Sequence, residues 1–122
     1  MDEREMARYL GTARVAVGAA MFLAPKWSGR VWVGRQADTT GARTVTRGFG
    51  GRDAALGLGL LMALEEGKGA GRWLALSAMA DAGDVAATLA GWGRLPRFNR
   101  LSVLMSAAGF GVLGAWLSTR VD

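Results

Sequence analysis

The sequence contains no cysteine and no histidine, and it has only two prolines and a single tyrosine. Without cysteine, disulfides and thiolate metal sites are excluded, and without histidine there is no imidazole for haem ligation or acid–base catalysis. Polar chemistry therefore falls mainly to carboxylates, hydroxyls and arginines. The sequence predicts no metal site and no cofactor.

A chain of 122 residues is enough for one domain and not for two. The net charge of +5 raises the question of nucleic-acid binding. However, the basic residues fall in short clusters between apolar blocks, not on a surface with recognition elements beside it, so no nucleic-acid partner is predicted. The hydrophobic share of 51% and the 19 glycines instead suit helices that pack closely in a bilayer.

Four apolar blocks follow one another along the chain. They cover residues 9–24, 48–64, 72–92 and 101–117, and only the fourth contains no charged residue. Each block is near the lower limit of length for a membrane-spanning helix. The pattern predicts an all-α, four-helix transmembrane bundle with short loops, in which residues 1–122 form a single integral membrane domain.

The aromatic residues with polar tips lie at the ends of these blocks and none lies in the middle. Tyr9 and Trp73 open blocks, whereas Trp27, Trp92 and Trp116 close them. These rings prefer the headgroup level of a membrane. The alternative is a soluble four-helix bundle, whose tryptophans would more often lie in the core and whose helices would show wide polar faces. The pattern favours a multi-pass protein of the cell membrane.

The longest connection, residues 26–47, joins the first two blocks. Its segment WSGRVWVGR mixes tryptophan and valine with arginine. Such a mixture is typical of a segment that lies on the membrane surface. We therefore expect one surface-lying link between the first and second helices.

Five charged residues lie inside the blocks, namely Arg14, Arg52, Asp53, Asp81 and Asp84. An arginine or aspartate at the centre of a membrane helix costs about 2.5–3.5 kcal/mol, so these residues need partners, protons or water. Ser77, Asp81, Asp84 and Thr88 follow the spacing i, i+4, i+7 and i+11, which places all four on one stripe of the third block. The stripe is expected to face the interior of the bundle.

Depth along the helices predicts which charges pair. At about 1.5 Å per residue, Arg14 and Asp81 lie at nearly equal depth, and Arg52 and Asp84 differ by about 4–5 Å. Asp53 is expected either to cap its helix or to join the cluster. Asp84 is matched less well than Asp81, so it is expected to hold the unneutralised position. Two arginines and three aspartates leave one negative charge that a proton, a cation or a cationic group would balance.

The aspartates admit a structural and a functional interpretation. They can simply fix which helices meet, or they can form a site, as ionisable groups inside a bundle generally do. The site hypothesis assigns Asp81, Asp84, Arg14, Arg52 and Asp53 to binding or acid–base chemistry on a small lipophilic molecule, by epoxide opening, isomerisation or cyclisation. Ser77 and Thr88 are the candidate ligand-binding residues.

Two alternatives remain open. One is a non-catalytic accessory or assembly subunit of a membrane complex, marked by a lipid-exposed glycine face. The other is a proton- or cation-coupled transporter, which would be a homodimer because four short helices enclose little volume.

Three segments carry a resemblance to known sequences: ARVAVGAAMFLAP, GGRDAALGLGLLMAL and LALSAMADAGDVAATLAG. They resemble an uncharacterised bacterial family of small four-helix integral membrane proteins, described only as a domain of unknown function. The resemblance covers residues 9–118, and Gly-Arg-Asp at 51–53 is its most specific part. It implies a membrane location and four helices, and it supplies no activity.

The charges of the loops predict the orientation. The side with both termini and the second loop carries Arg4, Arg8, Lys68, Arg72 and Arg120 against Asp2, Glu3, Glu5, Glu65, Glu66 and Asp122. The opposite side carries Lys26, Arg30, Arg35, Arg43, Arg47, Arg94, Arg97 and Arg100 against Asp38 alone. The side richer in basic residues is expected to be cytoplasmic, so both termini should face outward.

Single cysteines introduced into this cysteine-free chain test the orientation. A cysteine at Lys68 is expected to react with a membrane-impermeant maleimide on intact cells, and a cysteine at Arg97 only after the cells are opened. The reverse pattern would contradict the orientation. Recovery of both variants as soluble protein would contradict membrane insertion itself.

Overall fold

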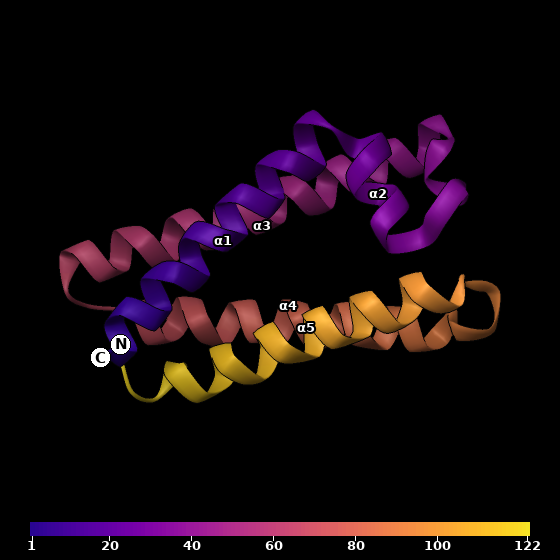
Figure 1. Ribbon diagram of the computed structural model, residues 1–122. Helices are drawn as coiled ribbons and strands as arrows, with labels where there is room; N and C mark the ends of the chain where they lie inside the picture. The colour runs from indigo at the N-terminus through magenta and orange to yellow at the C-terminus, as the bar shows by residue number, and fades with distance from the viewer.

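The computed structural model describes residues 1–122 and consists entirely of helices and their connections, which confirms the all-α prediction (Figure 1). The α-helices are α1 (Glu3–Leu23), α2 (Pro25–Val33), α3 (Thr40–Glu66), α4 (Ala70–Ala90) and α5 (Arg97–Ser118). Two short 3-10 helices connect them, η1 (Gly34–Asp38) and η2 (Trp92–Arg94). The four predicted blocks correspond to α1, α3, α4 and α5.

Two of these helices begin earlier than the apolar blocks because polar residues cap them. Asp2 and Glu5 form a capping box in which the amide of Glu5 donates to Asp2 Oδ1 over 2.8 Å, so α1 begins at Glu3 and not at residue 9. Thr39 caps α3 by accepting a hydrogen bond from the amide of Ala42 over 3.1 Å. Hydropathy alone gives no sign of these starts, since the added turns are polar.

The link between the first two long helices contains a fifth helix, which corrects the predicted count of four. Pro25 opens α2 at a position where a missing N–H costs nothing. Arg30 and Asp38 then tie α2 to η1 through two hydrogen bonds of 2.8 Å. The hydrogen bonds from Arg30 lower the pKa of Asp38 below its ordinary value.

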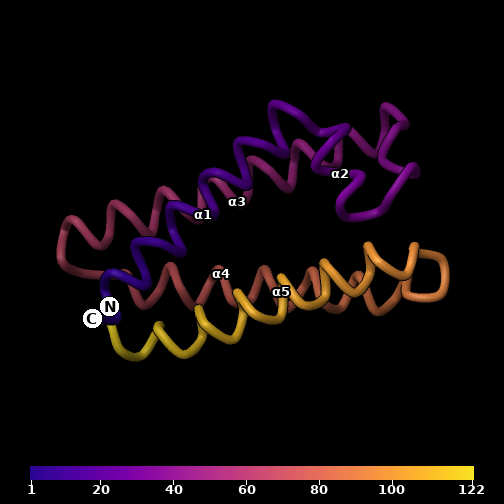
Figure 2. The backbone as a smooth tube through the Cα atoms, in the orientation of Figure 1, coloured from indigo at the N-terminus to yellow at the C-terminus, as the bar shows by residue number.

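The long helices form two antiparallel pairs, α1 with α3 and α4 with α5, and the pairs lie against each other (Figures 1 and 2). Contacts within each pair are far more extensive than those between the pairs. Both termini and the α3–α4 turn lie at one end of the bundle, and α2 and the α4–α5 turn lie at the other. The loops therefore divide between the ends as the orientation prediction requires.

Glycines bring α1 and α3 into backbone contact. A Cβ on Gly18 would lie 2.5 Å from the amide nitrogen of Ala54 and 2.5 Å from the carbonyl oxygen of Gly50. A Cβ on Gly57 would lie 2.6 Å from the carbonyl oxygen of Gly11. Small residues allow such an approach between helices. This close packing sets α1 beside the charged part of α3.

The hydrophobic core lies at the end of the bundle that holds the termini. Its buried residues are Ala7, Leu10, Leu60, Ala63, Leu64, Ala70, Leu74, Leu117 and Val121. Arg4 closes this end by donating to the carbonyl oxygens of Leu64 (2.7 Å) and Val121 (3.1 Å). The Asp122 carboxylate accepts hydrogen bonds from the first amides of α4, which lacks a side-chain cap of its own. Packing is therefore tightest away from α2.

Most of the apolar surface is exposed. Only 26 of 122 residues are buried, and large apolar side chains on all the long helices face outward. By length and composition, α5 is the one helix apolar enough to cross a membrane, and little of it is buried. The other long helices carry charged residues within their spans. The structure therefore supports one candidate span, not the predicted four.

Adjacent glycines on α3 provide a test of the close packing. Gly50→Ala is expected to destabilise the fold by about 1–3 kcal/mol, because its Cβ would lie 2.6 Å from the carbonyl oxygen of Gly18 and 2.8 Å from the amide of Phe22. Gly51→Ala is the matched control, because nothing lies within 4 Å of its added Cβ. This control should be neutral or stabilising by up to about 1 kcal/mol. Thermal unfolding in detergent measures both, and equal effects would contradict the interface.

Candidate functional site

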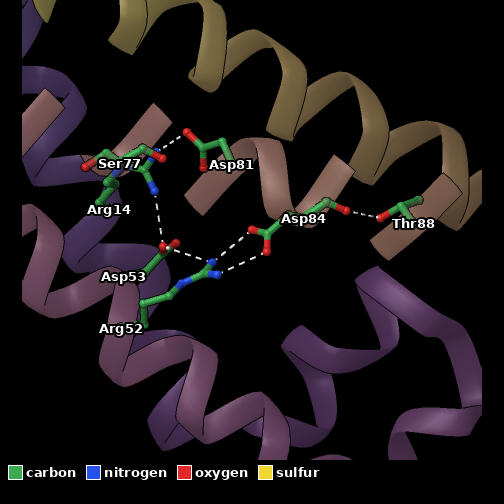
Figure 3. A network of polar contacts seen from close by, with 7 residues as sticks. All are labelled: Arg14, Arg52, Asp53, Ser77, Asp81, Asp84 and Thr88. Carbon is green, nitrogen blue, oxygen red and sulfur yellow. Dashed lines mark hydrogen bonds and ion pairs between the residues drawn. The ribbon is translucent and has the colours of Figure 1, made fainter. Parts of the chain in front are cut away.

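Arg14 connects three helices through its guanidinium group (Figure 3). From α1 it donates to Asp53 of α3 over 3.1 Å and to Asp81 of α4 through a short hydrogen bond. It also reaches the carbonyl oxygen of Ser77, 3.5 Å away. The predicted pair of Arg14 and Asp81 is confirmed, and Asp53 joins the cluster instead of capping α3.

Arg52 forms the second predicted pair with Asp84. Its terminal nitrogens donate to the two carboxylate oxygens over 3.1 and 2.8 Å, in the fork geometry that makes such pairs strong (Figure 3). Arg52 also lies 3.5 Å from Asp53. The expectation that Asp84 holds the unneutralised position is wrong, because the long arginine side chain spans the difference in depth and binds both of its oxygens.

Asp53 and Asp81 each have one carboxylate oxygen that accepts no hydrogen bond from the protein. Each uses a single oxygen toward the arginines, Oδ1 in Asp53 and Oδ2 in Asp81. No side chain or amide of the protein donates to Asp53 Oδ2 or to Asp81 Oδ1. The cluster thus combines two arginines, three aspartates and two carboxylate oxygens that are free to accept hydrogen bonds.

Burial varies across the cluster. The side chains of Arg14 and Asp81 are only 5% and 6% exposed, and those of Asp53 and Asp84 are 14% exposed. Arg52 is the most open at 31%. The cluster therefore has a closed side, formed by Arg14 and Asp81, and a more open side, formed by Arg52. No acceptor meets the buried Nε atom of either arginine.

The two hydroxyl residues of the predicted stripe lie beside the cluster. Ser77 is fully buried, and its hydroxyl has no hydrogen-bond partner. Thr88 is also buried, and its hydroxyl donates to the backbone carbonyl of Asp84 over 2.8 Å. Ser77 meets Arg14 only through its carbonyl oxygen. The structure therefore groups all five predicted charged residues but places both hydroxyls at the margin.

The cluster forms one wall of a cavity of about 370 Å³. The cavity is lined by Ala13, Arg14, Val17, Ala20, Met21, Ser28, Val31, Trp32, Arg52, Asp53, Asp81, Asp84, Ser102, Val103, Ser106, Ala107 and Phe110. Several of its residues on α1, α2 and α5 are exposed, so the cavity is open at its rim. Charged groups occupy one wall, and the remaining walls are largely apolar.

Sequence reasoning missed the walls that α2 and α5 contribute. Trp32 was assigned to the membrane surface, yet it packs on Phe49 with ring centroids 4.9 Å apart and lines the cavity. Ser102 and Ser106 lie one turn apart in the apolar part of α5 and line the same cavity as the cluster. That i, i+4 pair was a signal available in the sequence. The contribution of Phe110 had no such signal, because aromatic residues are common throughout apolar helices.

The side chains present at the site limit the chemistry that it can perform. No group of three or more histidine, cysteine, aspartate or glutamate side chains, the three aspartates of the cluster included, is arranged so that it could hold a metal ion. The serines of α5 share the cavity with carboxylates and arginines, and the lining contains no lysine or histidine that could activate them as nucleophiles. What the site offers is hydrogen-bond acceptance, negative charge and proton transfer at a carboxylate. No family model, curated protein or solved structure matches the chain.

The two arginines are expected to contribute unequally to stability. Arg14→Leu should lower the free energy of unfolding by about 3–5 kcal/mol, because it removes the donor of a buried carboxylate and one donor of a second. Arg52→Leu should cost less, because 31% of its side chain is exposed and water can reach Asp84. Thermal unfolding in detergent gives both values.

Removing both members of the open pair provides the control. The double variant Arg52→Leu with Asp84→Leu should recover most of the stability lost in Arg52→Leu, because no unpaired carboxylate remains at that position. Strictly additive losses would contradict a direct ion pair.

Proposed function

We propose that the chain is a multi-pass membrane protein whose cavity binds a small lipophilic molecule and whose carboxylates take part in binding it or in acid–base chemistry on it. The observation that carries the proposal is the joint location of all five charged residues of the apolar blocks in the lining of one cavity whose other residues are largely apolar. Concave, mostly apolar sites with a few converging polar groups are the usual form of ligand pockets.

The exposed surface supports the bilayer as the solvent. On α5 the exposed side chains include Leu101, Met105, Val112 and Trp116. Apolar surface of this extent is unfavourable in water and is matched by lipid tails. Trp27 is exposed near the opposite end of the bundle, so exposed tryptophans occur toward both ends, as membrane interfaces favour.

The charge of the cluster supports acid–base chemistry. With two arginines and three aspartates, binding a single proton makes the cluster neutral. A protonated carboxyl at Asp53 or Asp81 could then donate to an epoxide oxygen or a double bond, and a neighbouring carboxylate could accept the returning proton. Arg14, which binds both Asp53 and Asp81, would fix the positions of these two carboxyl groups relative to each other. Epoxide opening, isomerisation and cyclisation share this requirement.

A specific observation favours a second candidate, an accessory subunit of a membrane complex. Gly48 and Gly51 lie on the outside of α3, with nothing within 4 Å of an added Cβ. Ala55 continues this exposed row of small residues one turn further. Such rows allow a helix of another protein to approach closely. An accessory subunit would not need the cavity, so the two candidates differ in whether a ligand binds there.

Filling the cavity tests the proposal. Val103→Trp places a large ring among the lining residues, and Met105→Trp adds the same ring to an exposed position outside the cavity. With dodecan-1-ol as the probe, native mass spectrometry from a neutral detergent is expected to show one bound molecule on the wild type and on Met105→Trp. Binding to Val103→Trp should be at least tenfold weaker. Equal binding to both variants, or none to the wild type, would reject the cavity as the site.

A further inference from the structure

The geometry points to lipophilic amines as the ligand class of this cavity: molecules with a protonated amine at one end of an apolar body. This inference rests on the proposed function and makes it narrower. It follows from which polar atoms the protein has already satisfied and which it leaves facing the cavity.

The free charged atoms of the cavity are carboxylate oxygens, and the hydroxyl groups of Ser102 and Ser106 also belong to the lining. Asp53 and Asp81 both line the cavity, and in each of them one carboxylate oxygen receives no hydrogen bond from the protein. The side chain of Asp81 is only 6% exposed, but neither free oxygen is itself a fully buried atom, so a molecule in the cavity can reach both. A ligand that brings N–H groups would satisfy both acceptors.

The terminal nitrogens of both arginines, in contrast, are already engaged, and the Nε atoms, which lack a partner, are buried. The terminal nitrogens of Arg14 donate to Asp53 and Asp81, and those of Arg52 donate to Asp84. An anionic ligand such as a fatty acid would compete with these carboxylates for the same two guanidinium groups. The site is therefore less favourable for anions, although it contains arginines.

The net charge of the cavity lining also favours a lipophilic amine. The three aspartates outnumber the two arginines, and no other charged residue lines the cavity. A monocation makes the site neutral, whereas a carboxylate raises its negative charge to two. In surroundings of low dielectric, this difference strongly favours the cation.

The apolar walls suit the rest of such a molecule. Trp32 and Phe110 add aromatic rings to the cavity, and rings of this kind attract ammonium groups. A cavity of about 370 Å³ lies within the range of small-molecule pockets, so it suits one chain or a compact ring system. The exposed rim on α1 and α5 would allow entry of the ligand from the bilayer.

Three probes of equal chain length test the inference: dodecylamine, dodecan-1-ol and sodium dodecanoate, each with wild-type protein in a neutral detergent at pH 7. A primary amine is protonated at this pH. Titration followed by native mass spectrometry is expected to show at least tenfold tighter binding of the amine than of the alcohol. Dodecanoate should bind more weakly than the alcohol.

Variants connect the preference to the free oxygens. Asp53→Asn and Asp81→Asn should each reduce the advantage of the amine over the alcohol to about threefold or less, while binding of the alcohol persists. Asp38→Asn is the matched control, because it removes a carboxylate that lies outside the cavity. It should leave the advantage unchanged. Val103→Trp should weaken the binding of all three probes.

The outcomes separate this inference from the proposed function. Equal affinity for amine and alcohol, with both lost in Val103→Trp, would overturn the inference and leave the cavity as a site for neutral lipophiles. Tightest binding of dodecanoate would overturn it in favour of an anion site at the arginines. Absence of binding for all three probes would overturn the inference and the proposed function together. These comparisons use the wild type first, so they hold even if an aspartate variant fails to fold.

Discussion

The guanidinium of Arg14 joins α1, α3 and α4, and the arrangement of the other charged residues depends on it. A single arginine can serve two carboxylates on different helices because its terminal nitrogens diverge, and here they donate to Asp53 and Asp81. That geometry requires the backbones of α1 and α3 to be close. Gly18 and Gly50 provide the approach, since a Cβ at either position would overlap the backbone of the opposite helix. The ion cluster therefore depends on the close glycine contact between α1 and α3.

The two ends of the bundle have different roles. Near the termini, leucines and alanines from four helices fill the core, and Arg4 and Asp122 secure the chain ends and the start of α4. Toward α2 the helix pairs meet less closely, and the cavity lies there with the charged wall beside it. A firmly packed half thus holds the helices in register, while the other half retains space. This division is common where a rigid scaffold supports a site.

The sequence predicted the charged cluster more accurately than the helix limits. Helical periodicity and depth were sufficient to pair Arg14 with Asp81, at nearly equal depth, and Arg52 with Asp84, within the reach of an arginine side chain. The start of α3 at Thr40 was missed, since its first turns are polar and carry no hydropathy signal. The misassignment of Asp84 had another cause. Depth ranks the match between helices but does not show how donors are shared: Arg52 binds both oxygens of Asp84, whereas Arg14 divides its donors between Asp53 and Asp81.

The third aspartate distinguishes a purely structural cluster from a site. Arg14 with Asp81 and Arg52 with Asp84 would by themselves form two neutral pairs. Asp53 adds a negative charge that both arginines share and neither fully neutralises, with one of its oxygens left free. In a low-dielectric interior such a surplus destabilises the protein alone and stabilises any complex that brings a compensating proton or cation. Asp53 therefore links α1 to α3 through Arg14 and also supplies the surplus charge that the proposed ligand would neutralise.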